Sequence, residues 1–200
     1  SSDVCSSDLA ERYGRSERHW HNDVNQDFDF SKVTLTDHKP SIVDIRWNTT
    51  CNLSCNYCGP SCSSQWAGIM KIAHTRGVKP YYDQVCDYIE QHQNSVKEVA
   101  LVGGEPLLLN ENERLLDVIP ADSIVTLITN LNVDFDTNLI VKKLVKRSKV
   151  GWSMSLENIP ARFEYVRSGG NWYLTHKNAQ TVMRYIQELG HWGGIHAVYN

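Results

Sequence analysis

Short apolar runs alternate with amphipathic segments along most of this chain. Runs rich in β-branched and aromatic residues predict β-strands, and they cover residues 41–47, 96–102, 124–129, 150–156 and 195–199. Between them, apolar residues recur every three or four positions, which predicts helices over 80–93, 111–118, 136–148 and 174–189. The last helix is expected to end at Gly190, because glycine readily adopts the backbone conformation that terminates helices.

The alternation of strands and helices predicts an α/β fold with a parallel sheet joined by right-handed crossovers. Ligands in such folds bind at the carboxyl ends of the strands. Side chains with candidate chemistry follow four of the predicted strands. They are a cysteine loop after the first strand, Gly103-Gly104-Glu105-Pro106 after the second, Thr129-Asn130 after the third and Ser155 at the end of the fourth.

The sequence contains six cysteines, four of which fall within residues 51–62. Clustered thiols in a chain without a visible signal peptide indicate metal or redox chemistry rather than a disulfide framework. Cys51, Cys55 and Cys58 have the spacing Cys-x3-Cys-x2-Cys, and thiolates select iron–sulfur clusters, zinc or copper(I). A four-iron cluster usually takes four thiolates. Three cysteines would therefore leave one iron open, like the open position of catalytic zinc.

The cysteine spacing alone also allows a structural zinc site. Cys62 lies four residues after Cys58, so a closed site with four cysteine ligands is possible. The chain would then be a non-catalytic zinc-binding α/β module acting as an interaction domain. On the cluster interpretation, we expect Cys62 to be a nearby free thiol. We expect Cys86, which lies in a predicted helix, to be a core residue, since buried free cysteine behaves as a small hydrophobic side chain.

The cysteine loop with Tyr57 before its last cysteine, followed by Gly103-Gly104-Glu105-Pro106, resembles the radical SAM superfamily. The resemblance covers about residues 40–200, and the stretch 162–172 (RFEYVRSGGNW) resembles more narrowly the members that carry a twitch domain. It implies a partial (β/α)6 TIM-like barrel, here truncated after about the fifth strand. A complete eight-unit barrel takes about 250 residues, so a shorter core of five units is consistent with this length.

The resemblance implies an enzyme that holds a [4Fe–4S] cluster on Cys51, Cys55 and Cys58, with S-adenosylmethionine (SAM) on the open iron. In that superfamily, SAM is cleaved reductively to methionine and a 5′-deoxyadenosyl radical, which abstracts hydrogen from a substrate. The cofactors carry this chemistry and the protein positions them. The expected partners are a peptide or small-molecule substrate and an electron donor such as flavodoxin or ferredoxin.

The same resemblance implies a set of SAM contacts. Gly103 and Gly104 let the backbone approach a ligand closely. The resemblance implies that the segment Gly103-Gly104-Glu105-Pro106 receives the SAM amino group. A carboxylate is a suitable partner for an ammonium donor. The other implied contacts are Thr129 and Asn130 near the ribose and methionyl carboxylate, Ser155 against SAM, and Tyr57 against adenine.

Composition adds only broad limits. The 200 residues are 41% hydrophobic and 22% charged, with a net charge of −3, so the balance gives no electrostatic footprint for nucleic acid or a membrane surface. No apolar run approaches the roughly 20 residues that cross a bilayer, and a cytoplasmic location follows by default. Residues 1–9 read as a translated sequencing adapter and are expected to be an artefact. Residues 10–39 are a polar lead-in, and 40–200 form the core, with its C-terminal part expected to be missing.

Overall fold

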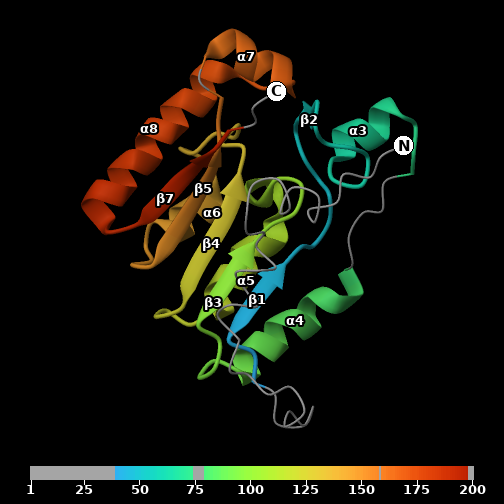
Figure 1. The fold of residues 1–200 in the computed structure, drawn as a ribbon. Helices are drawn as coiled ribbons and strands as arrows, with labels where there is room; N and C mark the ends of the chain where they lie inside the picture. Colours follow the sequence, from blue (N-terminus) through green and yellow to red (C-terminus); the bar gives the residue numbers. More distant parts are fainter. Residues whose placement is uncertain (1–38, 74–78, 158, 198–200) are drawn as a thin grey trace, which may run out of the picture. The chain divides into compact units, whose positions relative to one another are not determined.

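The computed structural model describes residues 39–73, 79–157 and 159–197, with only the backbone at residues 79 and 80. Its centre is a five-stranded sheet in the order β1-β3-β4-β5-β7, and all four strand pairs are parallel. The arrowheads of these strands point to one end of the sheet (Figure 1). The strands are β1 Ile42–Ile45, β3 Glu98–Leu101, β4 Ile124–Thr129, β5 Val150–Ser155 and β7 Trp192–His196. The predicted parallel α/β fold is confirmed.

Four helices connect consecutive strands of the sheet, as predicted. They are α4 Lys79–Gln91, α5 Asn110–Val118, α6 Leu139–Leu144 and α8 Trp172–Leu189. Helix α8 ends at Gly190, which has the left-handed backbone (φ 72°) that was predicted to stop it. Helix α6 begins later than its predicted start at residue 136, because Asn138 accepts a hydrogen bond from the Val141 amide and caps the helix there, and it ends at Leu144 instead of residue 148.

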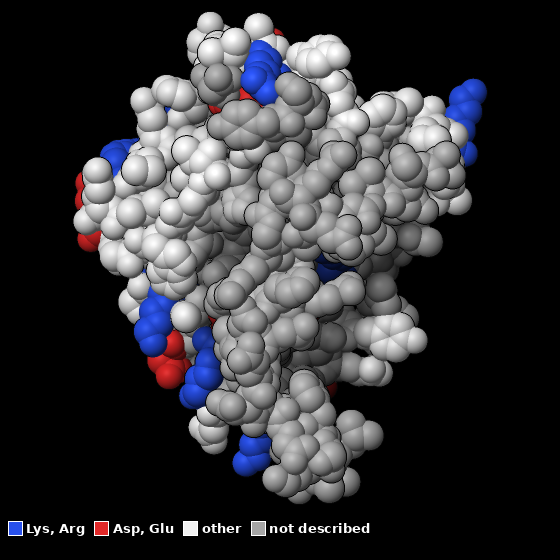
Figure 2. Space-filling view, viewed as in Figure 1, with Lys and Arg blue, Asp and Glu red and all other residues white. Residues whose placement is uncertain are grey.

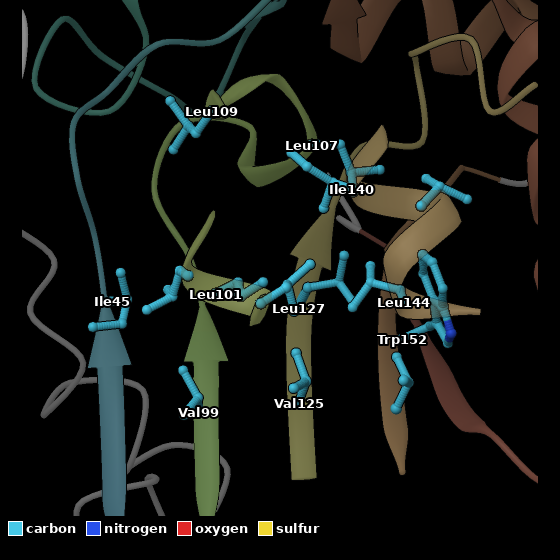
Figure 3. Packing of buried hydrophobic residues seen from close by; sticks show 14 of the residues in the cluster. Ile45, Val99, Leu101, Leu107, Leu109, Val125, Leu127, Ile140, Leu144 and Trp152 are labelled. Atoms are coloured by element: carbon cyan, nitrogen blue, oxygen red, sulfur yellow. The ribbon is translucent and has the colours of Figure 1, made fainter. Parts of the chain in front are cut away.

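The core lies between one face of the sheet and the helices behind it. Alternate residues of the central strands, such as Val99, Leu101, Val125 and Leu127, are buried on that face and pack with side chains of α5 and α6 (Figure 3). Trp152 of β5 joins the same cluster. Burying each such side chain stabilises the fold by about 1.5–3 kcal/mol, so this cluster fixes the strand ends that carry the candidate chemistry.

Several short elements were not predicted. They are α3 Ser64–Ile69, the 3-10 helix η3 Pro106–Leu108, α7 Pro160–Val166, and the two-residue strands β2 Ser54–Cys55 and β6 Arg167–Ser168. The fifth strand of the sheet begins earlier than its predicted range of 195–199, because it includes Gly193-Gly194. A Cβ on Gly193 would lie 2.5 Å from the Trp152 carbonyl oxygen, so the close approach of β7 to β5 requires glycine there.

Residues 1–9, the predicted artefact, lie outside the described residues. The same holds for residues 10–38 of the predicted lead-in. On the face shown in Figure 2, basic and acidic side chains of the described residues are interspersed. Ion pairs such as Lys143 with Asp117 and Lys177 with Asp136 join opposite signs at the surface. No helix in the described part of the chain combines the length and the apolar content that crossing a membrane requires.

Candidate active site

A pocket of about 180 Å³ lies at the carboxyl ends of the parallel strands. This is the end of the sheet beyond which β2, α3 and α7 are placed (Figure 1). Eleven residues were predicted for the site, and all of them except Glu105 and Pro106 line this pocket. The lining residues are Arg46, Cys51, Leu53, Cys55, Tyr57, Cys58, Cys62, Val102, Gly103, Gly104, Ile128, Thr129, Asn130, Ser155 and Arg167. Segments far apart in the sequence therefore converge as the strand-end rule predicts.

The start of α3 holds the cysteine loop in place. The backbone amide of Cys51 donates to the Ser64 hydroxyl at 3.1 Å, and that hydroxyl donates to the Cys51 carbonyl at 3.0 Å. The Ser63 hydroxyl donates to the Leu53 carbonyl at 2.6 Å, and the Trp66 indole N–H donates to the Cys55 carbonyl at 2.8 Å. These bonds satisfy backbone groups of the loop and tie it to the start of α3.

A second clamp comes from the segment after β5. Strands β2 and β6 pair antiparallel, with Cys55 opposite Arg167. Beyond the pair, the Asn56 backbone amide donates to the Val166 carbonyl at 2.8 Å, and its side chain donates to the Tyr165 carbonyl at 2.9 Å. The middle cysteine is thus fixed by residues more than a hundred positions later in the chain.

The three thiols differ in their surroundings. Cys51 is buried, and its burial raises the pKa of the thiol to about 11. A hydrogen bond from Cys58, together with the nearby positive charge of Arg167, lowers the pKa of Cys55. Cys58 is the donor to Cys55, which raises the pKa of Cys58. Since the thiolate is the form that binds metal, Cys55 is the thiol best prepared to act as a ligand.

Arg167 is a pocket residue whose role the sequence did not reveal. Its side chain is 3% exposed and forms an ion pair with the buried Glu157, with 3.1 Å between Nη2 and Oε1. The guanidinium also lies over the Tyr57 ring, 5.3 Å from its centre, and donates to the Tyr57 hydroxyl. One face of the aromatic side chain predicted to meet adenine is therefore already covered by a cation.

The glycine pair after β3 is explained by the cysteine loop that passes beside it. A Cβ on Gly104 would lie 2.3 Å from the Thr50 carbonyl oxygen and 2.6 Å from that of Thr49. Gly103 has φ +136°, where side chains are strained. The glycines therefore bring the end of β3 directly against the loop that carries Cys51.

Glu105 faces the interior instead of the pocket. One carboxylate oxygen accepts from the Thr129 hydroxyl at 2.7 Å and the Leu107 amide at 3.1 Å, and the other accepts from the Asn130 amide at 2.7 Å. The side chain is 1% exposed, and burial raises its pKa to about 7. Pro106 starts η3 and is also buried. Both side chains are buried, and neither lines the pocket.

Other predicted residues lie where the sequence suggested. Thr129 ends β4 and Asn130 follows it, both buried at the pocket, and Ser155 ends β5 and lines the pocket. Cys62 is exposed and also lines the pocket, whereas Cys86 is buried in the main core, as predicted.

The donor set at the pocket fits an iron–sulfur cluster in its chemistry. Among the described residues, no group of three or more His, Cys, Asp or Glu side chains is arranged to hold a metal ion as it stands. Cys51, Cys55 and Cys58 nevertheless line the same pocket, together with Cys62, and a four-iron cluster accepts each thiolate on a separate iron. The arrangement is therefore compatible with three thiolate ligands spread around a cluster.

Comparison with known proteins gives one curated relative. No protein-family model matches the sequence. Over 88 residues the chain is 34% identical to 7-carboxy-7-deazaguanine synthase of Clostridium acetobutylicum. The matched segment covers 44% of this chain and 33% of that protein. The match thus spans one third of the relative's length.

Solved structures with the same fold include Streptococcus suis SuiB, with a TM-score of 0.58 and 23% identity over 80% of this chain and 33% of that one. SuiB bound to S-adenosylmethionine gives a TM-score of 0.55 at 22% identity, again over 80% and 33%. The structure of anSMEcpe with bound AdoMet and the Kp18Cys peptide gives 0.54 at 17% identity, over 78% of this chain and 43% of that one. The chain therefore shares the parallel α/β fold of these solved structures.

Proposed function

We propose that residues 40–200 are the core of a radical SAM enzyme. One observation carries the proposal: the Cys-x3-Cys-x2-Cys loop and the polar ends of β3, β4 and β5 line a single pocket at the carboxyl edge of a parallel sheet. The 34% identical relative and the SAM-bound structures of the same fold support it. A structural zinc module has no need for this convergence.

In this proposal Cys51, Cys55 and Cys58 would hold a [4Fe–4S] cluster, and the strand ends beside them would receive SAM. When bound, the cluster and SAM would supply reductive C–S cleavage and hydrogen abstraction. In the protein, a hydrogen bond from Cys58 and the charge of Arg167 favour the thiolate of Cys55. The Gly103-Gly104 backbone packs against the cysteine loop, and Cys51 and Cys55 are buried. Arg46 places positive charge in the pocket wall, where an anionic carboxylate can pair with it, whereas the charge of Arg167 is already paired with Glu157.

The substrate class follows only from similarity. The anSMEcpe structure contains a peptide, and the curated relative is named for a small deazaguanine product. A peptide or small molecule is therefore the proposed substrate. The proposed electron donor is flavodoxin or ferredoxin, and the proposed location is the cytoplasm. The resemblance of residues 162–172 supports membership of the twitch-type group.

The proposal is tested by anaerobic reconstitution with iron and sulfide. The expected product is a brown protein with about four irons per chain, the content of a [4Fe–4S] cluster. Cys51→Ala should lose the colour and most of the iron, whereas Cys62→Ser, a change in the same loop, should keep both. A colourless protein with one zinc, lost in the Cys62 variant, would support the zinc module instead.

Activity is tested on the same samples. Reduction of the reconstituted protein in the presence of SAM should release 5′-deoxyadenosine, detected by liquid chromatography. Cys51→Ala should abolish this release and Cys62→Ser should retain it. A four-iron protein that binds SAM and never releases 5′-deoxyadenosine would argue against the proposed reaction.

A further inference from the structure

The side-chain amide of Asn130 contacts the sulfur of Cys51. Its Nδ2 lies 3.9 Å from Cys51 Sγ, and the same nitrogen donates to Asn52 Oδ1 at 2.9 Å. Asn130 is 7% exposed. Its two amide hydrogens are therefore directed at the cysteine loop and not at open solvent.

The orientation of this amide follows from its neighbours. Asn130 Oδ1 accepts from the backbone amide of Asn132 at 2.7 Å, and a backbone N–H can only donate. Asn52 uses its own Nδ2 to donate to the Asn132 carbonyl at 2.6 Å, which leaves Asn52 Oδ1 as an acceptor. Both partners thus require the nitrogen of Asn130 to face Asn52 and Cys51.

The position of Asn130 is fixed from the other side as well. Its backbone amide donates to Glu105, which also binds Thr129 at the end of β4. Cys51 has a second donor, the Leu53 backbone amide, 3.5 Å from the sulfur. The Cys51 sulfur is therefore buried and faces two N–H groups, one supplied by a side chain that can be replaced.

From this geometry we infer that Asn130 is a positioning residue that donates an N–H···S hydrogen bond to the Cys51 thiolate and so sets the reduction potential of the bound cluster. The inference rests on the proposed function. Hydrogen bonds to ligand sulfur stabilise the more negative, reduced form of a cluster and raise its potential. This role is separate from the SAM contact that sequence resemblance implies for Asn130, because it operates when SAM is absent.

The test is an EPR-monitored redox titration of the reconstituted, SAM-free protein and its variants. Asn130→Ser keeps a side-chain oxygen that can accept from the Asn132 amide, but its hydroxyl ends one bond short of the Asn130 Nδ2 position and so withdraws the donor from the Cys51 sulfur. Its midpoint potential should therefore be lower than that of the wild type. Asn130→Asp keeps the shape and replaces the donor by a negative charge, so its shift should be larger in the same direction. Ser155→Ala, which changes another pocket residue, should leave the SAM-free potential unchanged.

Iron content and circular dichroism of each sample separate the outcomes. Variants at residue 130 that hold about four irons and titrate like the wild type would overturn the inference while leaving the proposed function intact. A difference that appears only after SAM is added would also overturn it, in favour of a direct SAM contact. A wild-type protein that takes up no cluster would overturn the proposed function itself. If Asn130→Ser does not fold, the potential of Asn130→Asp decides.

Discussion

At the scale of single residues, Glu105 and Arg167 are charged side chains buried for different reasons. The Glu105 carboxylate joins β4 to η3 through three hydrogen bonds. Arg167 joins the cysteine loop to the end of β5, through Tyr57 on one side and Glu157 on the other. Each supports the pocket through contacts that a neutral substitute cannot reproduce.

Glu105 makes stability depend on pH. Because burial raises its pKa from 4.5 to about 7, the folded protein holds this proton more tightly than the unfolded chain. The stabilisation is fully present below about pH 4.5 and is lost as the pH rises through about 7, a loss of up to about 3 kcal/mol. Urea unfolding between these pH values should show this fall for the wild type.

The control for this prediction is Glu105→Gln, which cannot titrate. Its unfolding free energy should vary less with pH over the same range. The variant should also be about 1–3 kcal/mol less stable at the acidic end, because its amide nitrogen would face the Asn130 N–H. Equal pH slopes in the two proteins would contradict the assigned cause.

Arg167→Gln should strongly destabilise the protein. The change leaves Glu157, whose side chain is 1% exposed, as a buried carboxylate without its cation. Removing one partner of a buried ion pair costs about 3–5 kcal/mol. In urea titrations the double variant Arg167→Gln/Glu157→Gln should recover part of this loss. A double variant as unstable as the sum of both single changes would show that the ion pair is not the cause.

At the scale of elements, the helices and strands that could be predicted have a longer repeat of apolar residues than those that were missed. Strand β4 and helix α8 are long enough for their apolar repeats to be read. Strands β2 and β6 have two residues each, so their pairing leaves no pattern in the sequence. The role of Arg167 depends on that pairing, which is why the residue was not predicted.

The contact between the end of β3 and the cysteine loop is tested by Gly104→Ala. The added methyl group would lie 2.3 Å from the backbone oxygen of Thr50, so the loop must move. We expect a loss of about 1–3 kcal/mol in stability and a lower iron content after reconstitution. Gly194→Ala is the matched control, because a Cβ there meets no atom within 4 Å. Full iron content in Gly104→Ala would argue against this close packing.

At the scale of the whole described fold, the position of the pocket could be predicted and its inner wall could not. The rule that parallel strands present ligands at their carboxyl ends brought residues after β1, β3, β4 and β5 together correctly. The rule does not say which way a strand-end side chain turns. Glu105 turns inward, because Thr129, Asn130 and Leu107 offer it three donors, and those partners become neighbours only in the folded chain.

The pairing of β2 with β6 has a consequence for synthesis on the ribosome. Ser54 and the carbonyl of Ser168 that it contacts are 114 residues apart, and domains are made from the N-terminus at about 5–20 residues per second. A nascent chain that has emerged only as far as β4 has all its pocket cysteines but lacks the strand that holds Cys55. The cysteine loop therefore cannot complete its pairing until Ser168 has left the ribosome, and its thiols are without that clamp until then.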